Sequence, residues 1–269
     1  MGSNPAGRAI HLLRFNPRGK AIRYFVLAAG LWFVAIGAPG AFAGEGELRE
    51  SHRGVTLIAV PPAPGFDYDI EIIDGRQALD KLRDALDVLL DKSPYSAAAI
   101  ERLGENGEII LVYNPSFPET VVSGNQLNAL AVFRAGLVDS SSGTVGALVF
   151  PVMISRYLAK WPRDQVAAGL AHELVGHGIQ YLEGRLGAME PRDRECEANL
   201  YTEMVFQDLG VDKRSRFMTG FRQSLEWFWC KSFKDYMAAH RPQSLGLWKQ
   251  LNPDVPELII VFKQYVLSK

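Results

Sequence analysis

The feature that most constrains this chain is a pair of histidines five residues apart within a helical sequence. His172-Glu173-Leu174-Val175-Gly176-His177 holds two of the chain's five histidines, with a glutamate directly after the first. Metal-binding histidine pairs on a helix are usually four residues apart, because that spacing turns both imidazoles onto one helix face. A spacing of five separates two side chains by roughly 140° on a regular α-helix. The pattern therefore indicates either a chance match or a π-bulge, a rare local widening that tends to occur at functional sites.

The histidine segment resembles the motif of a known family of zinc peptidases. It matches the H-E-x-x-G-H motif of the dipeptidyl peptidase III family, which has the same additional residue. A second segment, Glu195-Cys196-Glu197-Ala198-Asn199, begins 18 residues after His177 and resembles the last five positions of that family's E-E-C-R-A-E motif. The second segment fits the broader gluzincin pattern equally well. The resemblance implies one zinc ion held by His172, His177 and Glu195, and a catalytic base at Glu173.

The resemblance covers about thirty of the 269 residues and departs from the family at three positions. Arg194 stands where the family has an acid, Glu197 replaces a basic residue and Asn199 replaces the final glutamate. The gap between the two motifs is also shorter than in that family. The resemblance therefore bears on the site and implies little about the rest of the fold.

The residue types support the same chemistry independently. A catalytic zinc takes three protein ligands and keeps a fourth position for water, and two imidazoles with one carboxylate fit that requirement. Glu173 is placed to accept the proton of the attacking water and pass it to the departing amine. Asn199 lies one helical turn beyond Glu195, so we expect it to hydrogen-bond a ligand imidazole. A donor to the developing oxyanion is also needed, and Tyr201, Tyr236 and His240 are the candidates.

The N-terminal segment predicts export. Residues 1–43 contain five basic residues and no acidic one, and an apolar run from Tyr24 to Ala38 precedes Pro39-Gly40 and the A-x-A sequence Ala41-Phe42-Ala43. This is the pattern of a signal peptide cleaved before Gly44. The alternative is a retained membrane anchor, since Tyr24 to Ala43 is just long enough to span a bilayer. In both cases we expect residues 44–269 to be a single domain outside the cytoplasm, either periplasmic or extracellular.

Net charge limits the classes of binding partner, and the cysteine content limits the possible cross-links. Loss of residues 1–43 removes five positive charges from a formal net charge of −1 and leaves −6, which argues against nucleic acid as a partner. The expected partner is a peptide or protein substrate, with membrane contact only if the N-terminal segment is retained. Cys196 and Cys230 are either a disulfide or two buried thiols, and both alternatives remain open.

The pattern along residues 44–269 predicts an α+β fold, with a small mixed β-sheet followed by a helical half that carries a zincin-like active-site helix. We expect strands at 55–60, 66–73, 108–113, within 121–138 and at 146–154, and a turn at 139–143. We expect helices at 76–91, 96–103, 162–185, 191–209, from 213 onward and at 255–267. Pro151 suggests that strand 146–154 is a sheet edge, where an extended substrate could pair, and an ordinary core strand is the alternative.

The function expected from the sequence is zinc-dependent hydrolysis of peptide bonds. Two alternatives remain open at this point. A zinc amidohydrolase would act on non-protein or cell-wall amides with the same ligands. A non-catalytic binding module would use the zinc only for stability, although closed structural sites favour cysteine ligands.

Overall fold

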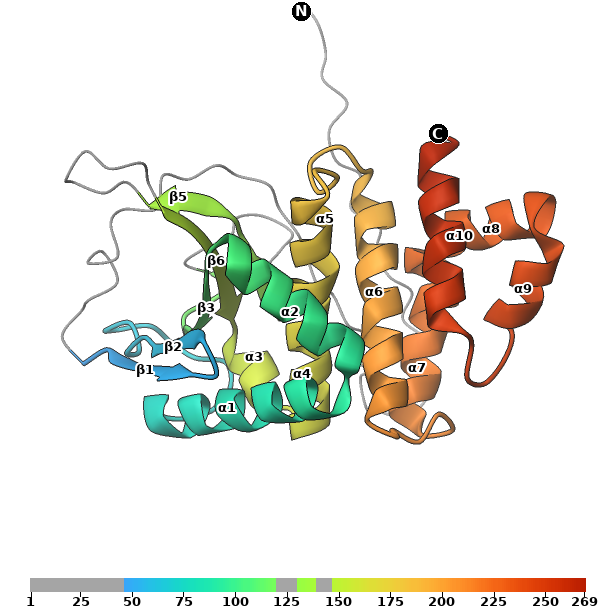
Figure 1. Cartoon of the computed structure of the whole chain (residues 1–269). Coiled ribbons are helices and arrows are strands. Elements are labelled where there is room, and N and C mark those ends of the chain that lie inside the picture. Colours follow the sequence, from blue (N-terminus) through green and yellow to red (C-terminus); the bar gives the residue numbers. More distant parts are fainter. Residues whose placement is uncertain (1–45, 120–129, 139–146) are drawn as a thin grey trace, which may run out of the picture.

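A computed structural model of the chain describes residues 46–119, 130–138 and 147–269. Strands and two helices make up the part of the chain up to Ile154, and helices follow from Arg156 onward, as Figure 1 shows, so the predicted α+β class is confirmed. The expected signal sequence at 1–43 and the expected turn at 139–143 lie outside the described residues. No helix within the described ranges is both long and apolar enough to cross a membrane.

The β-sheet is mixed and has the strand order β1-β2-β3-β6-β4, with β5 also pairing with β6. β2 and β3 run parallel, as do β3 and β6, whereas β1, β4 and β5 are antiparallel to their neighbours. Arg53 and Gly54 both have positive φ, at 50° and 81°, which is the geometry of a two-residue hairpin turn between β1 and β2. The strands are β1 Leu48–His52, β2 Val55–Ala59, β3 Glu108–Tyr113, β4 Ala131–Phe133, β5 Gly136–Val138 and β6 Ala147–Ile154.

The prediction of a strand at 66–73 is wrong. This segment follows Pro61, Pro62 and Pro64 and forms no ladder. Side chains hold it instead. Asp69 accepts a hydrogen bond of 2.9 Å from Nε of the buried Arg156, and the Tyr68 hydroxyl lies 2.8 Å from Ser116 Oγ. The alternation of polar and apolar residues indicated a strand. The segment is irregular instead, and side-chain hydrogen bonds to neighbouring segments fix its backbone.

β6 is an interior strand, so the alternative of an ordinary core strand is the one the structure shows. It pairs with β3 on one side and with β4 and β5 on the other. Pro151 lies opposite Arg134, between the residues paired with β4 and those paired with β5. Its carbonyl accepts the Arg134 N–H at 2.9 Å, but its nitrogen has no proton to return, so the ladder is interrupted there. A proline thus marks a break between two short outer strands, and β4 with β5 forms the edge.

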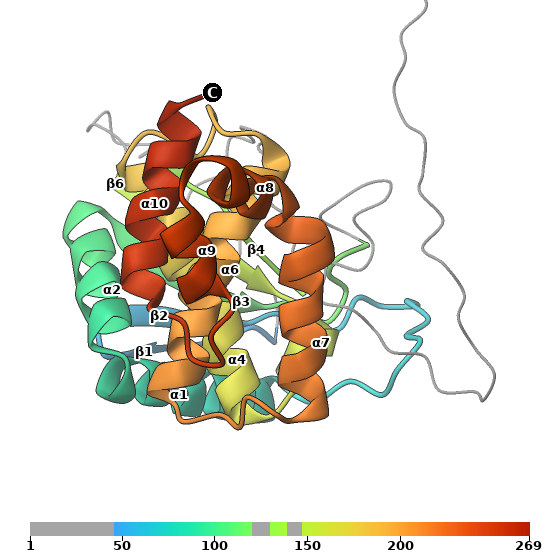
Figure 2. The same ribbon diagram turned by 90° about the vertical axis from the view of Figure 1, so that its right-hand side faces the viewer.

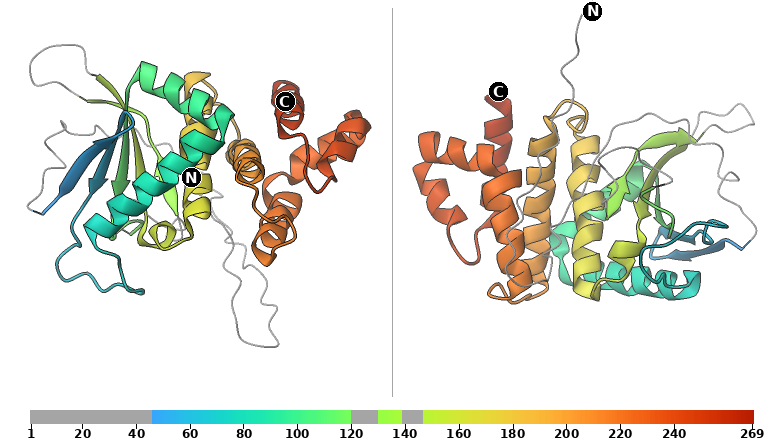
Figure 3. Two further views of the ribbon diagram at one scale, coloured as in Figure 1. Left: turned by 60° about the horizontal axis from the view of Figure 1, so that its bottom comes forward. Right: turned by 180° about the vertical axis from the view of Figure 1, so that it is seen from behind.

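Two helices, α1 (Gly75–Lys92) and α2 (Pro94–Asn106), cover one face of the sheet and reach the motif helix (Figure 3). The expected helix at 76–91 is confirmed, with its leucines buried in the core. One continuous hydrophobic cluster joins this face of the sheet to the helical half. A small second cluster lies on the opposite face, and its buried members are Ile58, Ile110, Val112 and Val149.

The helical half begins after β6 and stacks outward from the sheet (Figures 1 and 2). Pro162 precedes the motif helix, as expected, and Pro191 begins the next long helix. The elements are α3 Arg156–Ala159, α4 Arg163–Ala171, η3 His172–His177, α5 Gly178–Leu182, α6 Pro191–Asp208, α7 Arg216–Ser224, η4 Leu225–Trp229, α8 Lys231–His240, α9 Pro242–Trp248 and α10 Val255–Leu267. Here α6 lies between the motif helix and the C-terminal helices.

Candidate metal centre

The motif helix contains one π-helical turn, and the turn coincides with the motif. α4 leads into η3, which spans His172–His177, and α5 continues the helix from Gly178. The Gly178 N–H bonds the carbonyl of Glu173, five residues earlier, as a π-helix requires. Residues i and i+5 are therefore one turn apart. The imidazole ring centroids of His172 and His177 lie 5.0 Å from each other, so the predicted widening of the helix is confirmed.

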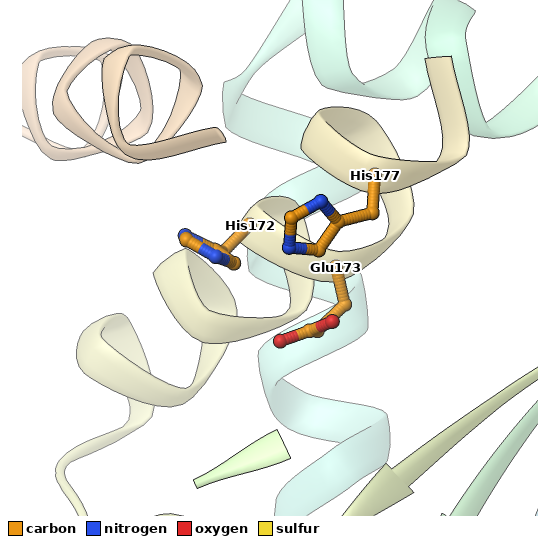
Figure 4. A group of neighbouring side chains, drawn as sticks. All are labelled: His172, Glu173 and His177. Atoms are coloured by element: carbon orange, nitrogen blue, oxygen red, sulfur yellow. The ribbon is translucent and has the colours of Figure 1, made fainter. Parts of the chain in front are cut away.

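Three side chains of η3 form a group that could hold a metal ion (Figure 4). His172, Glu173 and His177 each offer one ligand atom, and these atoms all lie within 4.8 Å of one another. The three residues are no more than 1% exposed. Burial matters here because an unpaired polar group away from water is costly unless a hydrogen bond or an ion compensates it.

Glu195 of α6 brings a second carboxylate to the same place. One of its oxygens lies 3.2 Å from Nε2 of His172, and the other lies 3.7 Å from Nε2 of His177. The Glu195 side chain is 6% exposed. The carboxylate therefore spans the two imidazoles, and the four residues singled out by the two sequence motifs meet in one buried place.

Each imidazole has a partner at its other nitrogen. Gln180 Oε1 lies 2.9 Å from Nδ1 of His177, and Thr202 Oγ1 lies 3.3 Å from Nδ1 of His172. Among the described residues, Nε2 of His177 has no hydrogen-bond partner although it is buried. This nitrogen is buried without a hydrogen bond and faces two carboxylates. A bound cation would satisfy it, so the residues of this group fit a metal ion.

Burial sets the charge state of the group. It lowers the pKa of His172 to about 3 and that of His177 to about 4, so both imidazoles are neutral at pH 7. The neutral imidazole is the form that binds metals. Burial and the nearby Glu195 carboxylate raise the pKa of Glu173 well above its usual value, and the hydrogen bond from the Phe133 N–H opposes this. That bond, 2.7 Å to Glu173 Oε2, comes from β4.

The structure gives Asn199 a different role from the predicted one. Its Nδ2 donates to the carbonyl of Glu195, 2.7 Å away and one turn back in the same helix. The partners of the imidazoles are Gln180 and Thr202 instead. An asparagine within a helix can bond its own backbone, and here the Asn199 amide does so, whereas we expected it to bond an imidazole.

The candidate oxyanion donors have other neighbours. Tyr201 is fully buried in α6, where its ring stacks on Tyr95 of α2 with centroids 5.4 Å apart. Tyr236 and His240 lie on α8, with ring centroids 5.0 Å apart, and Tyr236 also packs on Tyr265 of α10. α8 lies across α6 from η3 (Figure 3). None of these contacts places the three residues with the metal group, and the identity of the donor stays a prediction.

Sequence reasoning missed three members of the site. Gln180 follows His177 by three residues and Thr202 follows Glu195 by seven, and both spacings return to the same side of a helix. Those spacings were a usable signal. The third member, the backbone N–H of Phe133, has no signal of its own, because any residue other than proline carries the same donor.

The two cysteines form a disulfide, which decides the alternative left open by the sequence. Cys196 of α6 is joined to Cys230 at the end of η4, and their Cα atoms are 4.9 Å apart. Neither sulfur is a thiolate, so neither is a metal ligand. Any metal in this site has only nitrogen and oxygen ligands.

No known protein family, curated protein or solved structure matches this chain.

Proposed function

We propose that this chain is a zinc-dependent peptidase in which His172, His177 and Glu195 hold one zinc ion and Glu173 is the general base. One observation carries the proposal. A π-helical turn brings both imidazole Nε2 atoms beside the Glu195 carboxylate, at 3.2 and 3.7 Å, with Glu173 in the same buried group. Two imidazoles and a carboxylate are the ligand set of hydrolytic zinc sites. When bound, zinc acidifies water and polarises a carbonyl.

Glu173 performs the proton transfers in this proposal. Its carboxylate takes a proton from the water that attacks the carbonyl carbon of the substrate, and the same proton then goes to the amine nitrogen as the C–N bond breaks. The hydrogen bond from the Phe133 N–H to Oε2 holds the carboxyl group in place and leaves Oε1 for the proton. The raised pKa of Glu173 suits a group that must accept a proton and release it again.

The outer edge of β4 borders Glu173 and is suited to a peptide substrate. Arg134 directs its N–H toward β6, where Pro151 accepts it. Backbone groups alternate in direction along a strand, so the neighbouring Phe133 N–H points away from β6, and Glu173 accepts it there. β4 ends the strand order on this side of the sheet. An extended peptide bound along this edge would use backbone hydrogen bonds that require no particular sequence.

The ligand types favour catalysis over a structural metal. Structural zinc sites are mostly rich in cysteine and have no open position, and both cysteines of this chain are in the disulfide. The proximity of Glu173 to both histidines leaves a definite question, whether it is a fourth ligand or the base. A fourth protein ligand would close the site, whereas a base leaves a position for water.

The Glu173→Gln variant separates these roles. We expect it to keep zinc, measured as bound metal per protein, and to lose at least a thousandfold of its activity on a peptide library digested and analysed by mass spectrometry. His177→Ala should lose the metal and the activity together. Loss of zinc from Glu173→Gln would make Glu173 a ligand. Unchanged activity in that variant would end the proposal. Cleavage of cell-wall peptides without cleavage of the library would favour the amidohydrolase alternative.

A further inference from the structure

Gln180 of α5 connects the candidate metal centre to a buried ion pair. Its side chain is fully buried. Oε1 lies 2.9 Å from Nδ1 of His177, and Nε2 donates to the carbonyl of Arg194 at 2.9 Å and to Glu197 Oε2 at 3.1 Å. The Gln180 amide thus bridges the motif helix and α6, and neither helix needs these side-chain hydrogen bonds to form.

The two neighbours of Nε2 fix which way the Gln180 amide points. A backbone carbonyl can only accept, so one of these neighbours requires a donor whatever its surroundings. Glu197 is also an acceptor, because Arg185 binds both of its oxygens, each at 2.7 Å. The NH₂ group must therefore face Arg194 and Glu197, and the amide oxygen must face His177.

The orientation of Gln180 in turn fixes the tautomer of His177. An amide oxygen cannot donate, so the proton between it and His177 must sit on Nδ1 of the imidazole. Nε2 of His177 is buried and has no hydrogen-bond partner among the described residues, so with the ring proton on Nδ1 this nitrogen carries a lone pair and no proton. That is the nitrogen beside Glu195. A lone pair beside a carboxylate is repulsive unless a cation lies between them.

His172 has a different neighbour at Nδ1, the Thr202 hydroxyl. The Thr202 hydroxyl has a single proton and donates it to the carbonyl of Ala198 at 3.1 Å. Its lone pair therefore faces Nδ1 of His172, at 3.3 Å, while the Glu195 carboxylate lies 3.2 Å from Nε2 of the same ring, so each nitrogen of His172 faces an acceptor. Each imidazole thus has a separate hydrogen-bond acceptor at Nδ1, Gln180 for His177 and Thr202 for His172. The pair offers a matched test.

We propose that Gln180 is a positioning residue for the metal, held in its working orientation by Glu197 and Arg185. The metal-positioning role rests on the proposed zinc site, whereas the orientation of Gln180 rests on the hydrogen-bond directions alone. The set of bonded side chains extends to the C-terminal helix, because Arg185 also binds Glu183 at 2.6 Å and Lys263 of α10 binds Glu183 at 2.7 Å. The C-terminal helix is thereby linked through four side chains to the orientation of a metal ligand.

The test compares Gln180→Met with Thr202→Val, each similar in size to the residue it replaces. Long-range ¹H–¹⁵N spectra of the metal-free protein report the tautomer of each imidazole, and chelator competition reports the zinc dissociation constant. We expect Gln180→Met to convert His177 partly or wholly to the Nε2–H form, to leave His172 unchanged, and to weaken zinc binding about 10- to 100-fold. We expect Thr202→Val, which removes the acceptor at Nδ1 of His172, to leave His177 unchanged.

Two results would overturn the inference. One is an unchanged Nδ1–H signal of His177 in Gln180→Met, and the other is a zinc affinity within twofold of the wild type in that variant. If Gln180→Met does not fold, Arg185→Gln provides the test at a partly buried position, where the side chain is 20% exposed. An unaltered His177 tautomer in that variant would contradict the proposed role of Arg185. The spectra are taken without metal, so they test Gln180 even if the wild type binds no zinc, a result that would count against the proposed function alone.

Discussion

Gly176 of η3 packs directly on Ala198 of α6, so closely that a β-carbon at position 176 would lie 2.6 Å from Cβ of Ala198 and 2.7 Å from its Cα. Carbon atoms do not approach one another to this distance, and a helix backbone cannot yield as a flexible side chain can. The missing side chain at Gly176 therefore allows η3 and α6 to approach as they do. This approach places Glu195 of α6 beside the two histidines of η3.

Gly176→Ala should consequently separate the two helices and damage the site. We expect the zinc dissociation constant to rise at least tenfold and the free energy of unfolding to fall by about 1–3 kcal/mol, as for other overpacked cores. Chelator competition and urea denaturation measure the two quantities.

Gly220→Ala is the matched control. Gly220 lies in α7, and a β-carbon there would meet nothing within 4 Å. This variant should bind zinc as the wild type does and gain about 0.5–1 kcal/mol of stability from the better helix propensity of alanine. Wild-type zinc affinity in Gly176→Ala would show that the helix contact does not set the ligand geometry.

Metal removal should destabilise the protein. A ligand that binds only the folded state adds about 2.7 kcal/mol at a free concentration of 100 times its dissociation constant. We expect a chelator to lower the melting temperature and added zinc to restore it. Glu195→Gln should lose most of this zinc-dependent shift, because the carboxylate that spans the two imidazoles is replaced by a neutral amide.

Glu190→Gln, an exposed acid just before the first residue of α6, serves as the comparison. Its zinc-dependent shift should equal that of the wild type. Equal shifts in Glu190→Gln and Glu195→Gln would remove Glu195 from the ligand set and leave the three residues of η3 as the group to be tested.

The sequence predicted the site better than its surroundings. A spacing of five residues between His172 and His177 permits one geometry for a shared metal, a widened helical turn, so a local pattern was enough to predict η3. The start of α6 at Pro191 was equally local, since proline at the first helical position needs no donor. Such features depend on residues a few positions apart, and sequence periodicity records them.

The features that the sequence did not reveal depend on distant contacts. Pro151 argued for an edge strand, but β4 and β5 cover β6 around the proline, and only strand pairing shows this. Asn199 and Thr202 both return to the side of Glu195, and the choice between them as partner of an imidazole depends on the rotation of α6 against η3. A helical pattern gives the face, but packing between helices selects the residue.

The Cys196–Cys230 disulfide should contribute mainly to stability. It links positions 34 residues apart, and the loss of chain entropy in the unfolded state predicts a contribution of about 3–4 kcal/mol. Cys230→Ser should lose about this much in urea denaturation, and the wild type in reductant should match it. Zinc affinity should change less than threefold, because Glu195 is placed by the contact of α6 with η3. A stability unaffected by both treatments would contradict the disulfide.

The last prediction concerns the metal-free protein in acid. Burial lowers the pKa of His172 to about 3 and of His177 to about 4, whereas both titrate at 6.5 when unfolded. Well above pH 6.5 the two imidazoles are neutral in both states and contribute no pH dependence. Below pH 6.5 the unfolded chain binds protons that the folded protein does not, so the free energy of unfolding falls. Each histidine contributes a slope of up to about 1.4 kcal/mol per pH unit until its folded pKa is reached.

Urea denaturation with chelator present, at several pH values between 7 and 4, measures this slope. His177→Gln should lower this slope by close to the contribution of one histidine, about 1.4 kcal/mol per pH unit, because the variant has no group at position 177 to protonate in the unfolded chain. His240→Gln removes an exposed histidine of α8 and should leave the slope nearly as it is in the wild type. Equal slopes in the wild type and His177→Gln would mean that the folded protein also protonates His177 in this range. The imidazole would then not be the buried, neutral metal ligand that the proposed function requires.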